Sequence, residues 1–310
     1  DYRSKRWYDN DVNKHDANLF ARANWQVTDG LRLFGDLQYR YVSYRTWGVN
    51  DNFVSEEAGM QPIDVDKQYH FFNPRAGVSY TLAERSNFYL SFAIAQKEPT
   101  RSDFTDRYKF AADDSYPSSE KLYDWELGYA YTAPRLSLGV NLYYMKYKDQ
   151  LVPTGMVNDG DDALNVNVPD SYRRGVELSA SWRATGWFTV GANATFAQNR
   201  IENYVDALKD SPTYGKELGD RTIAYSPDVI ANAFLDFHYR GFEAVLHTQY
   251  VGKQYFTNNE NNALSLDAYC VTNLNLAYTF RTRSARSVRL GLLINNLFNA
   301  EYESNGYGYS

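Results

Sequence analysis

The sequence predicts an all-β chain that folds as a transmembrane, antiparallel, up-and-down β-barrel, and three observations support this prediction. Apolar and polar residues alternate with a period of two along many short segments, as in strands with one apolar face. Short and long connections between these segments alternate strictly. Charged and polar residues occupy the second face of the segments, which is typical of a barrel whose interior is wet or plugged.

The strands are the first element of this prediction. The clearest one runs from Arg135 to Lys148, where Leu136, Leu138, Val140 and Leu142 share one face. Each segment has at least the roughly 9 to 11 residues that a tilted strand needs to cross a bilayer. Twelve strands are predicted, near residues 16–28, 31–47, 69–82, 86–97, 121–132, 135–150, 171–184, 187–202, 227–239, 242–255, 269–280 and 286–298.

The connections are the second element. Those at 29–30, 83–85, 133–134, 185–186, 240–241 and 281–285 are short, and those at 48–68, 98–120, 151–170, 203–226 and 256–268 are long. Membrane barrels place short turns on one rim and long loops on the other. A sandwich with Greek-key crossings has no reason to keep this alternation through six hairpins. The five long connections carry 21 acidic and 7 basic residues, so the loop rim is predicted to be acidic.

The polar faces are the third element. A small soluble barrel would fill its interior with apolar side chains, but the faces opposite the apolar ones carry charged and amide groups. These residues are Arg22, Asn24, Asp36, Gln38, Arg40, Glu126, Glu177, Arg183, Asp236, His238, Glu243 and His247. Tyr and Trp residues gather near strand ends, where membrane barrels have interfacial girdles.

Composition excludes several other classes. Mean hydropathy is -0.59, and no apolar run approaches the roughly 18 residues of a membrane helix. Cys270 is the only cysteine, so a disulfide within the chain and a thiolate metal cluster are excluded. The net charge of -6 argues against a nucleic-acid partner. The first ten residues have no apolar core of the kind found in signal peptides.

Six segments resemble a known family in order and spacing. They are FFNPRAGVSYTLAERSNFYLSFAIAQKEPTRSDF (71–104), SEKLYDWELGYAY (119–131), LGVNLYYMKYKDQLV (138–152), YRRGVELSASW (172–182), YSPDVIANAFLDF (225–237) and INNLFNAEY (294–302). Together they are similar to the C-terminal half of TonB-dependent receptor barrels, and the tyrosine-rich composition resembles the receptors of Bacteroidetes.

The resemblance implies a plugged barrel of about 22 strands in the bacterial outer membrane, with this chain, residues 1–310, as part of one barrel domain. The plug domain with its TonB-contacting box, and a final strand after Tyr302, are expected to be absent from the chain. The implied partners are the TonB machinery, reached through the plug, an iron chelate or similar small ligand, and outer-membrane lipid. No cofactor is implied.

One loop contains candidate ligand-binding residues. Arg101, Arg107 and Tyr116 lie in the connection 98–120 with further aromatic residues, and they could bind an anionic chelate by charge-assisted hydrogen bonds and ring contacts. The alternative is an ordinary rim loop whose arginines pair with neighbouring aspartates such as Asp103. His238 and His247 could form a relay or metal pair, although ordinary lumen-facing residues are the simpler interpretation.

Other chemistry is weakly indicated. The acidic run 158–162 could hold a hard cation but lacks the ligand spacing of an EF-hand. We find no catalytic or metal constellation in the sequence.

The favoured function is import of a scarce nutrient such as an iron-siderophore by a TonB-dependent receptor. A passive porin-type channel, an outer-membrane enzyme and a soluble carbohydrate-binding β protein remain alternatives.

Overall fold

A computed structural model describes residues 8–50, 60–105, 116–157, 163–208, 211–282 and 286–306. Most of them form long strands. The strands of the main sheet are β1 (Tyr8–Gln26), β2 (Leu31–Asn50), β3 (Gln61–Ala83), β4 (Ser86–Lys97), β5 (Glu120–Thr132), β6 (Leu136–Val157), β7 (Ala163–Arg183), β8 (Phe188–Ile201), β9 (Arg221–Thr222), β10 (Val229–Tyr239), β11 (Phe242–Val251), β14 (Tyr269–Phe280) and β15 (Val288–Ile294). The smaller elements are α1 (Arg101–Thr105), β12 (Gln254–Tyr255), η3 (Asn262–Leu264) and β13 (Ser265–Leu266).

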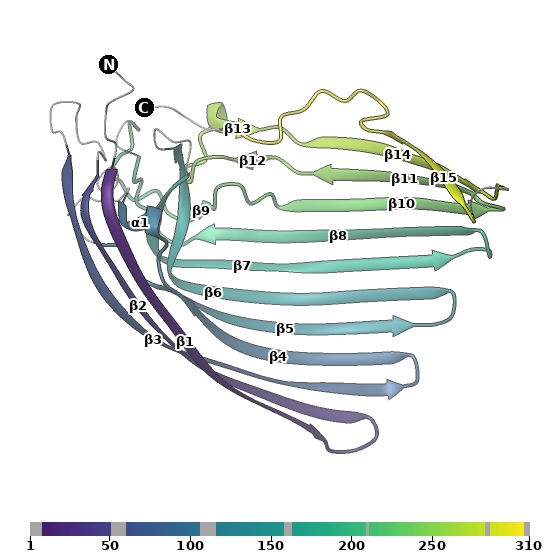
Figure 1. The fold of residues 1–310 in the computed structure, drawn as a ribbon, viewed down its shortest axis with the longest axis horizontal. Helices are drawn as coiled ribbons and strands as arrows, with labels where there is room; N and C mark the ends of the chain where they lie inside the picture. Colours follow the sequence, from purple (N-terminus) through teal and green to yellow (C-terminus); the bar gives the residue numbers. More distant parts are fainter. Residues whose placement is uncertain are drawn as a thin grey trace.

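The main sheet has an up-and-down topology. Its order is β1-β2-β3-β4-β5-β6-β7-β8-β10-β11-β14-β15, every neighbouring pair is antiparallel, and β9 pairs with β8. The strands lie side by side in a curved sheet, with the short turns along one edge and the long connections along the other (Figure 1). The twelve strands predicted from the sequence are therefore all present and are joined in the predicted order.

Register confirms the assignment of the two faces. Val140 pairs with Leu178 and Leu138 with Ala180, whereas Asn141 pairs with Glu177. Residues paired across antiparallel strands point to the same side, so the apolar rows are continuous from strand to strand. All twelve polar residues predicted for the interior fall on the opposite face in this register. We call the two faces outer and inner.

The predicted strand boundaries were wrong at the rim that carries the long connections. β1 begins at Tyr8 and β3 at Gln61, and the pair β6 and β7 continues to Val157 and from Ala163. Much of the predicted loops 48–68 and 151–170 is therefore strand, as is part of the segment before residue 16. Outside a bilayer both faces of a strand are wet, so the apolar alternation that marks a strand in the sequence is lost there. β15 is shorter than predicted.

Burial is concentrated at the same rim. Two apolar clusters lie there: Val152, Val168, Ile201, Tyr204 and Ile223 form one, and Tyr44, Ile63, Val65 and Phe104 form the other. The large exposed apolar side chains lie mainly on the outer face, Leu90, Leu127, Leu142 and Leu292 among them. In the part of the chain that the structure describes, no helix is long and apolar enough to span a membrane.

The short turns have the geometry that their residues favour. At the β10–β11 turn, Arg240 and Gly241 both have positive φ, 47° and 87°, which is the backbone of a type I′ hairpin. A Cβ atom at Gly241 would also meet the carbonyl oxygen of Thr279. This turn therefore needs glycine for both conformation and space.

Candidate ligand-binding site

The connection between β4 and β5 folds back onto the inner face of the sheet. α1 lies between the β2–β3 pair and β7 (Figure 1). The Asp103 carboxylate accepts hydrogen bonds from the backbone and hydroxyl of Thr100, at 2.6 and 2.7 Å, and from Asn165 Nδ2 of β7, at 2.9 Å. This described part of the connection is therefore an ordered element of the inner wall at the loop rim.

An aromatic cluster anchors this element. The Phe104 side chain is 1% exposed, and its ring stacks on Tyr44 of β2 with a centroid separation of 5.3 Å. Its other neighbour is Tyr116, whose ring is 6.1 Å away in an edge-on arrangement. The Tyr116 hydroxyl donates to the carbonyl oxygen of Asp64 at 2.8 Å, and Lys67 Nζ lies 5.2 Å from its ring centroid.

Two of the three predicted ligand-binding residues are brought to this surface. Arg101 and Tyr116 both lie on the inner face, Arg101 beside Asn10 of β1 and Tyr116 against Phe104. Arg101 donates to the side-chain oxygen of Asn10, and its guanidinium lies 5.9 Å from the ring centroid of Tyr8. Asp103 is occupied by Thr100 and Asn165, as described above. Arg107 lies outside the described residues.

An ion-pair network continues the site along β1 and β2. Glu98 is 7% exposed and accepts from Lys14 at 2.8 Å and from both terminal nitrogens of Arg40, at 2.8 and 2.9 Å. Arg40 also pairs with Asp16 at 2.6 Å. Burial opposes ionisation of Glu98, but the hydrogen bonds from the two cations outweigh it and hold the pKa of this carboxyl below its usual value.

Sequence reasoning missed Lys14, Lys67 and Glu98 as members of this site. Arg40 was recognised only as an inner-face residue. Glu98 and Arg40 are 58 residues apart in the chain, and no local pattern pairs them. The one available signal was strand alternation, which places Lys14 and Arg40 on the same face of neighbouring strands.

A second ordered cluster lies in the connection between β8 and β10. Asp206 is 1% exposed and accepts from the hydroxyls of Ser211 and Thr213, both at 2.6 Å, and from the amide of Leu208 at 3.1 Å. Burial opposes its ionisation, but these hydrogen bonds prevail and lower its pKa. Asn259 Nδ2, from the connection after β12, also donates to this carboxylate at 3.3 Å. Because the carboxylate is engaged by these neighbouring loop residues, its role is structural.

The two histidines proposed from the sequence as a relay or metal pair are not brought together in the structure. His238 pairs with Glu243 across the β10–β11 hairpin, whereas His247 pairs with Phe234, so the two imidazoles lie at different levels. His238 Nε2 is instead 2.5 Å from Asp236. The described residues contain no group of three or more His, Cys, Asp or Glu suited to a metal ion. The acidic run 158–162 lies outside the described residues.

The two faces and the topology define the class of protein. A curved up-and-down antiparallel sheet with an exposed apolar outer face and a polar inner face is the wall of an outer-membrane β-barrel. Residues 1–297 match the model of the family "TonB dependent receptor-like, beta-barrel". The chain belongs to this family, and its location is the outer membrane of Gram-negative bacteria.

Individual relatives agree with this assignment. The pesticin receptor of Yersinia enterocolitica is 26% identical over 190 residues, which are 61% of this chain and 26% of the receptor. The structure of the ferric yersiniabactin uptake receptor FyuA from Yersinia pestis aligns with 98% of this chain, and the alignment covers 44% of the FyuA chain. The two are 18% identical in sequence, and the TM-score is 0.72. The siderophore receptor PiuA from Acinetobacter baumannii aligns with 95% of this chain, and the alignment covers 40% of the PiuA chain, at 16% identity and a TM-score of 0.70.

The chain therefore spans about a quarter of the pesticin receptor and less than half of the solved receptors it matches. Neighbours in the comparison are receptors and transporters by name, and none of those reported above is named as an enzyme. The family match and these relatives favour neither a passive channel nor a soluble carbohydrate-binding protein.

Proposed function

We propose that this chain is part of the barrel of a TonB-dependent importer that takes up an anionic metal chelate, of which an iron-siderophore is the favoured example. The barrel supplies a rigid passage and part of the ligand vestibule, and it performs no bond chemistry. Transport is driven by the TonB machinery, which acts through a plug domain supplied by another part of a longer protein.

The observation that carries this proposal is the charge and aromatic content of the inner wall around α1. Arg101 is held by the neutral amide of Asn10, and Lys67 lies over the ring of Tyr116. Neither of these contacts cancels the positive charge. An anionic ligand with flat aromatic or chelating groups can use both cations and the Tyr116 ring. The names of two structural neighbours, a ferric yersiniabactin uptake receptor and a siderophore receptor, support the same class of ligand.

The open sheet supports the assignment to a longer barrel. Within the described residues, β1 pairs only with β2 and β15 only with β14. Unpaired backbone groups cost several kcal/mol each in hydrocarbon. We therefore propose that further strands of the same protein close the barrel between β15 and β1.

The test is ligand binding by the full-length protein that contains this chain. Purified protein is titrated with ferric complexes of catecholate, hydroxamate and phenolate siderophores, and binding is followed by quenching of intrinsic fluorescence. We expect one class to bind tightly, and the double variant Arg101→Ala, Lys67→Ala to weaken that binding by at least about tenfold, because each charge-assisted contact contributes about 1.5–3 kcal/mol.

Arg183→Ala is the matched control, since Arg183 is also a cation of the inner face but lies at the opposite end of β7. Its affinity should equal that of the unmodified protein. Equal affinities for the double variant and the control would reject the site. Failure of every ferric complex to bind would reject the proposed ligand class.

A further inference from the structure

The outer face of β5 to β8 carries a basic surface directly above the apolar band. Strand alternation and register place five cations there. Asp170 and Glu202 are the acidic residues in the same rows, and Asp228 lies 3.9 Å from Arg200. The basic surface consists of Lys121, Lys146, Lys148, Arg174 and Arg200. The whole chain has a net charge of -6, so this concentration of positive charge on the lipid-facing side is not a consequence of overall composition.

Aromatic rings are interleaved with these cations. Trp125 and Tyr144 are paired neighbours in the lowest row of the basic surface, which also contains Arg174, and their ring centroids lie 5.7 Å apart. Lys121 Nζ lies 5.0 Å from the ring centroid of Tyr123, and the Arg174 guanidinium lies 5.2 Å from that of Tyr172. Tyr and Trp in this position mark the boundary between headgroups and hydrocarbon in membrane barrels. The basic surface therefore lies at the level of the lipid headgroups.

The cations differ in how far their charge is neutralised. Lys146 is bridged to Asp170 and Glu202, and Lys148 to Asp170. The guanidinium of Arg174, in contrast, donates twice to the neutral side-chain oxygen of Gln198, at 2.8 and 2.5 Å. Arg174 is exposed. The Arg174 hydrogen bonds and the Lys121 ring contact leave both positive charges uncancelled, facing the bilayer interface.

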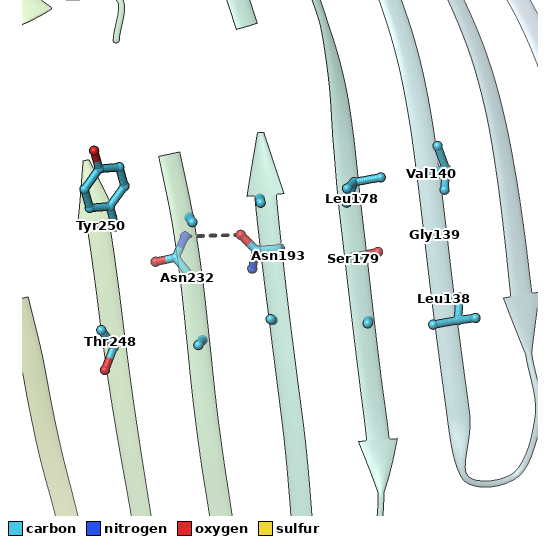
Figure 2. Close-up of a pocket in the computed structure, with 14 residues that line it drawn as sticks. Leu138, Gly139, Val140, Leu178, Ser179, Asn193, Asn232, Thr248 and Tyr250 are labelled. Carbon is cyan, nitrogen blue, oxygen red and sulfur yellow. Dashed lines mark hydrogen bonds between the residues drawn. The ribbon is translucent and has the colours of Figure 1, made fainter. Parts of the chain in front are cut away.

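Below the basic surface the apolar band is hollowed. A depression of about 520 Å³ lies on the outer face between Leu138, Val140 and Leu178 on one side and Thr248 and Tyr250 on the other (Figure 2). The side chains at its floor are short, because the outward-facing positions between these two walls are alanines. Five of them come from three strands: Ala180, Ala192, Ala194, Ala231 and Ala233. The Asn193–Asn232 hydrogen bond, 3.1 Å, lies on the inner face behind them (Figure 2).

We propose that this outer surface binds one specific membrane lipid with an anionic phosphate headgroup. Arg174 holds the phosphate, and an acyl chain runs down the outer face into the depression. Lys121 lies in a row four residues higher and two strands away, and adds positive charge to the same headgroup region. The geometry fits such a molecule, because Leu178 at the edge of the depression is four residues below Arg174 on β7, or about 13 Å along the strand. The charge of the cations selects an anionic headgroup over a zwitterionic one. This lipid site is separate from the chelate site, which lies on the inner face.

The test uses the full-length protein in vesicles of phosphatidylcholine, with and without phosphatidic acid. Thermal unfolding is measured in each, and native mass spectrometry counts the lipid retained after detergent extraction. We expect phosphatidic acid to raise the unfolding midpoint and to be retained. The double variant Arg174→Gln, Lys121→Gln should bind it about thirtyfold more weakly, since each cation near an anionic lipid contributes about a fivefold factor.

Two further variants separate this site from general effects of charge or folding. Arg173→Gln removes the same charge from the neighbouring residue on the inner face, and it should keep the response to phosphatidic acid. Ala194→Phe fills the depression without changing charge and should reduce lipid retention. Equal midpoints in the two vesicle types, or equal losses in Arg173→Gln and the double variant, would overturn the proposal. A double variant that instead changed the oligomeric state, with lipid retention intact, would assign the surface to protein contact and would also overturn it.

Discussion

Leu178 is the position at which the outer face should be least tolerant of charge. It lies on β7 midway between Arg174, at the upper interface, and Trp182, near the short turns, four residues from each. At about 3.3 Å per residue and a strand tilt of about 40°, each interface is about 10 Å away in depth. An arginine introduced here would stay within hydrocarbon, because its side chain is too short to carry the guanidinium fully to either interface.

We therefore expect Leu178→Arg to lower the free energy of unfolding by about 2–4 kcal/mol, the cost of an arginine at the bilayer midplane of a barrel. Ser179→Arg is the matched change, since Ser179 is the next residue and points to the polar inner face, opposite Asn193. Its cost should stay below about 1 kcal/mol. Both values can be measured by denaturant titration of the full-length protein in liposomes. Equal costs, or a larger cost for Ser179→Arg, would refute the assignment of the two faces.

Three further predictions concern individual elements. Gly241→Val should destabilise the barrel by more than about 1 kcal/mol and slow its folding, whereas Gly186→Val, in a turn with open space around it, should have little effect in the same refolding assay. Asp206 has a lowered pKa, so its stabilisation of the loop is present above about pH 4 and is lost as pH falls through the folded-state value. Hydrogen exchange of that loop should therefore rise at acidic pH, and an Asp206→Asn variant should lack this response. Glu98→Gln should cost about 1–3 kcal/mol in unfolding titrations, and adding Lys14→Gln should recover part of the loss; full additivity of the two costs would argue against their ion pair.

The interior of the membrane span was predictable because its information is local. Alternation along 135–150 gives the strand and its lipid-facing side, and the residues at 240–241 give the turn. Beyond the membrane this signal is absent. The polar segment Tyr8–Asp16 alternates no apolar residues, yet it pairs with β2 along its whole length. There the hydrogen-bond ladder of a neighbouring strand determines the structure, and a single segment of sequence does not contain that neighbour.

The candidate site shows the same division. Arg101 and Tyr116 were predicted from the residue types of one loop, and the structure places both on the inner face. Their partners were not predictable, because Arg101 meets Asn10 across 91 residues and Tyr116 meets Asp64 across 52. Such contacts depend on where a loop folds back, which is decided by packing of a side chain such as Phe104 in a distant strand pair.

Residue periodicity and turn chemistry within about 20 neighbouring residues were enough to predict the twelve long strands, their order, their two faces and the rim that carries the short turns. The short strands β9, β12 and β13 were not predicted. Tertiary structure alone decided how far the strands extend beyond the membrane, where α1 lies against the inner wall, and how alanines from β7, β8 and β10 meet to hollow the outer face. The physical reason is that these features arise from side chains that become neighbours only when separate strands pair in register, and register is a property of the whole sheet.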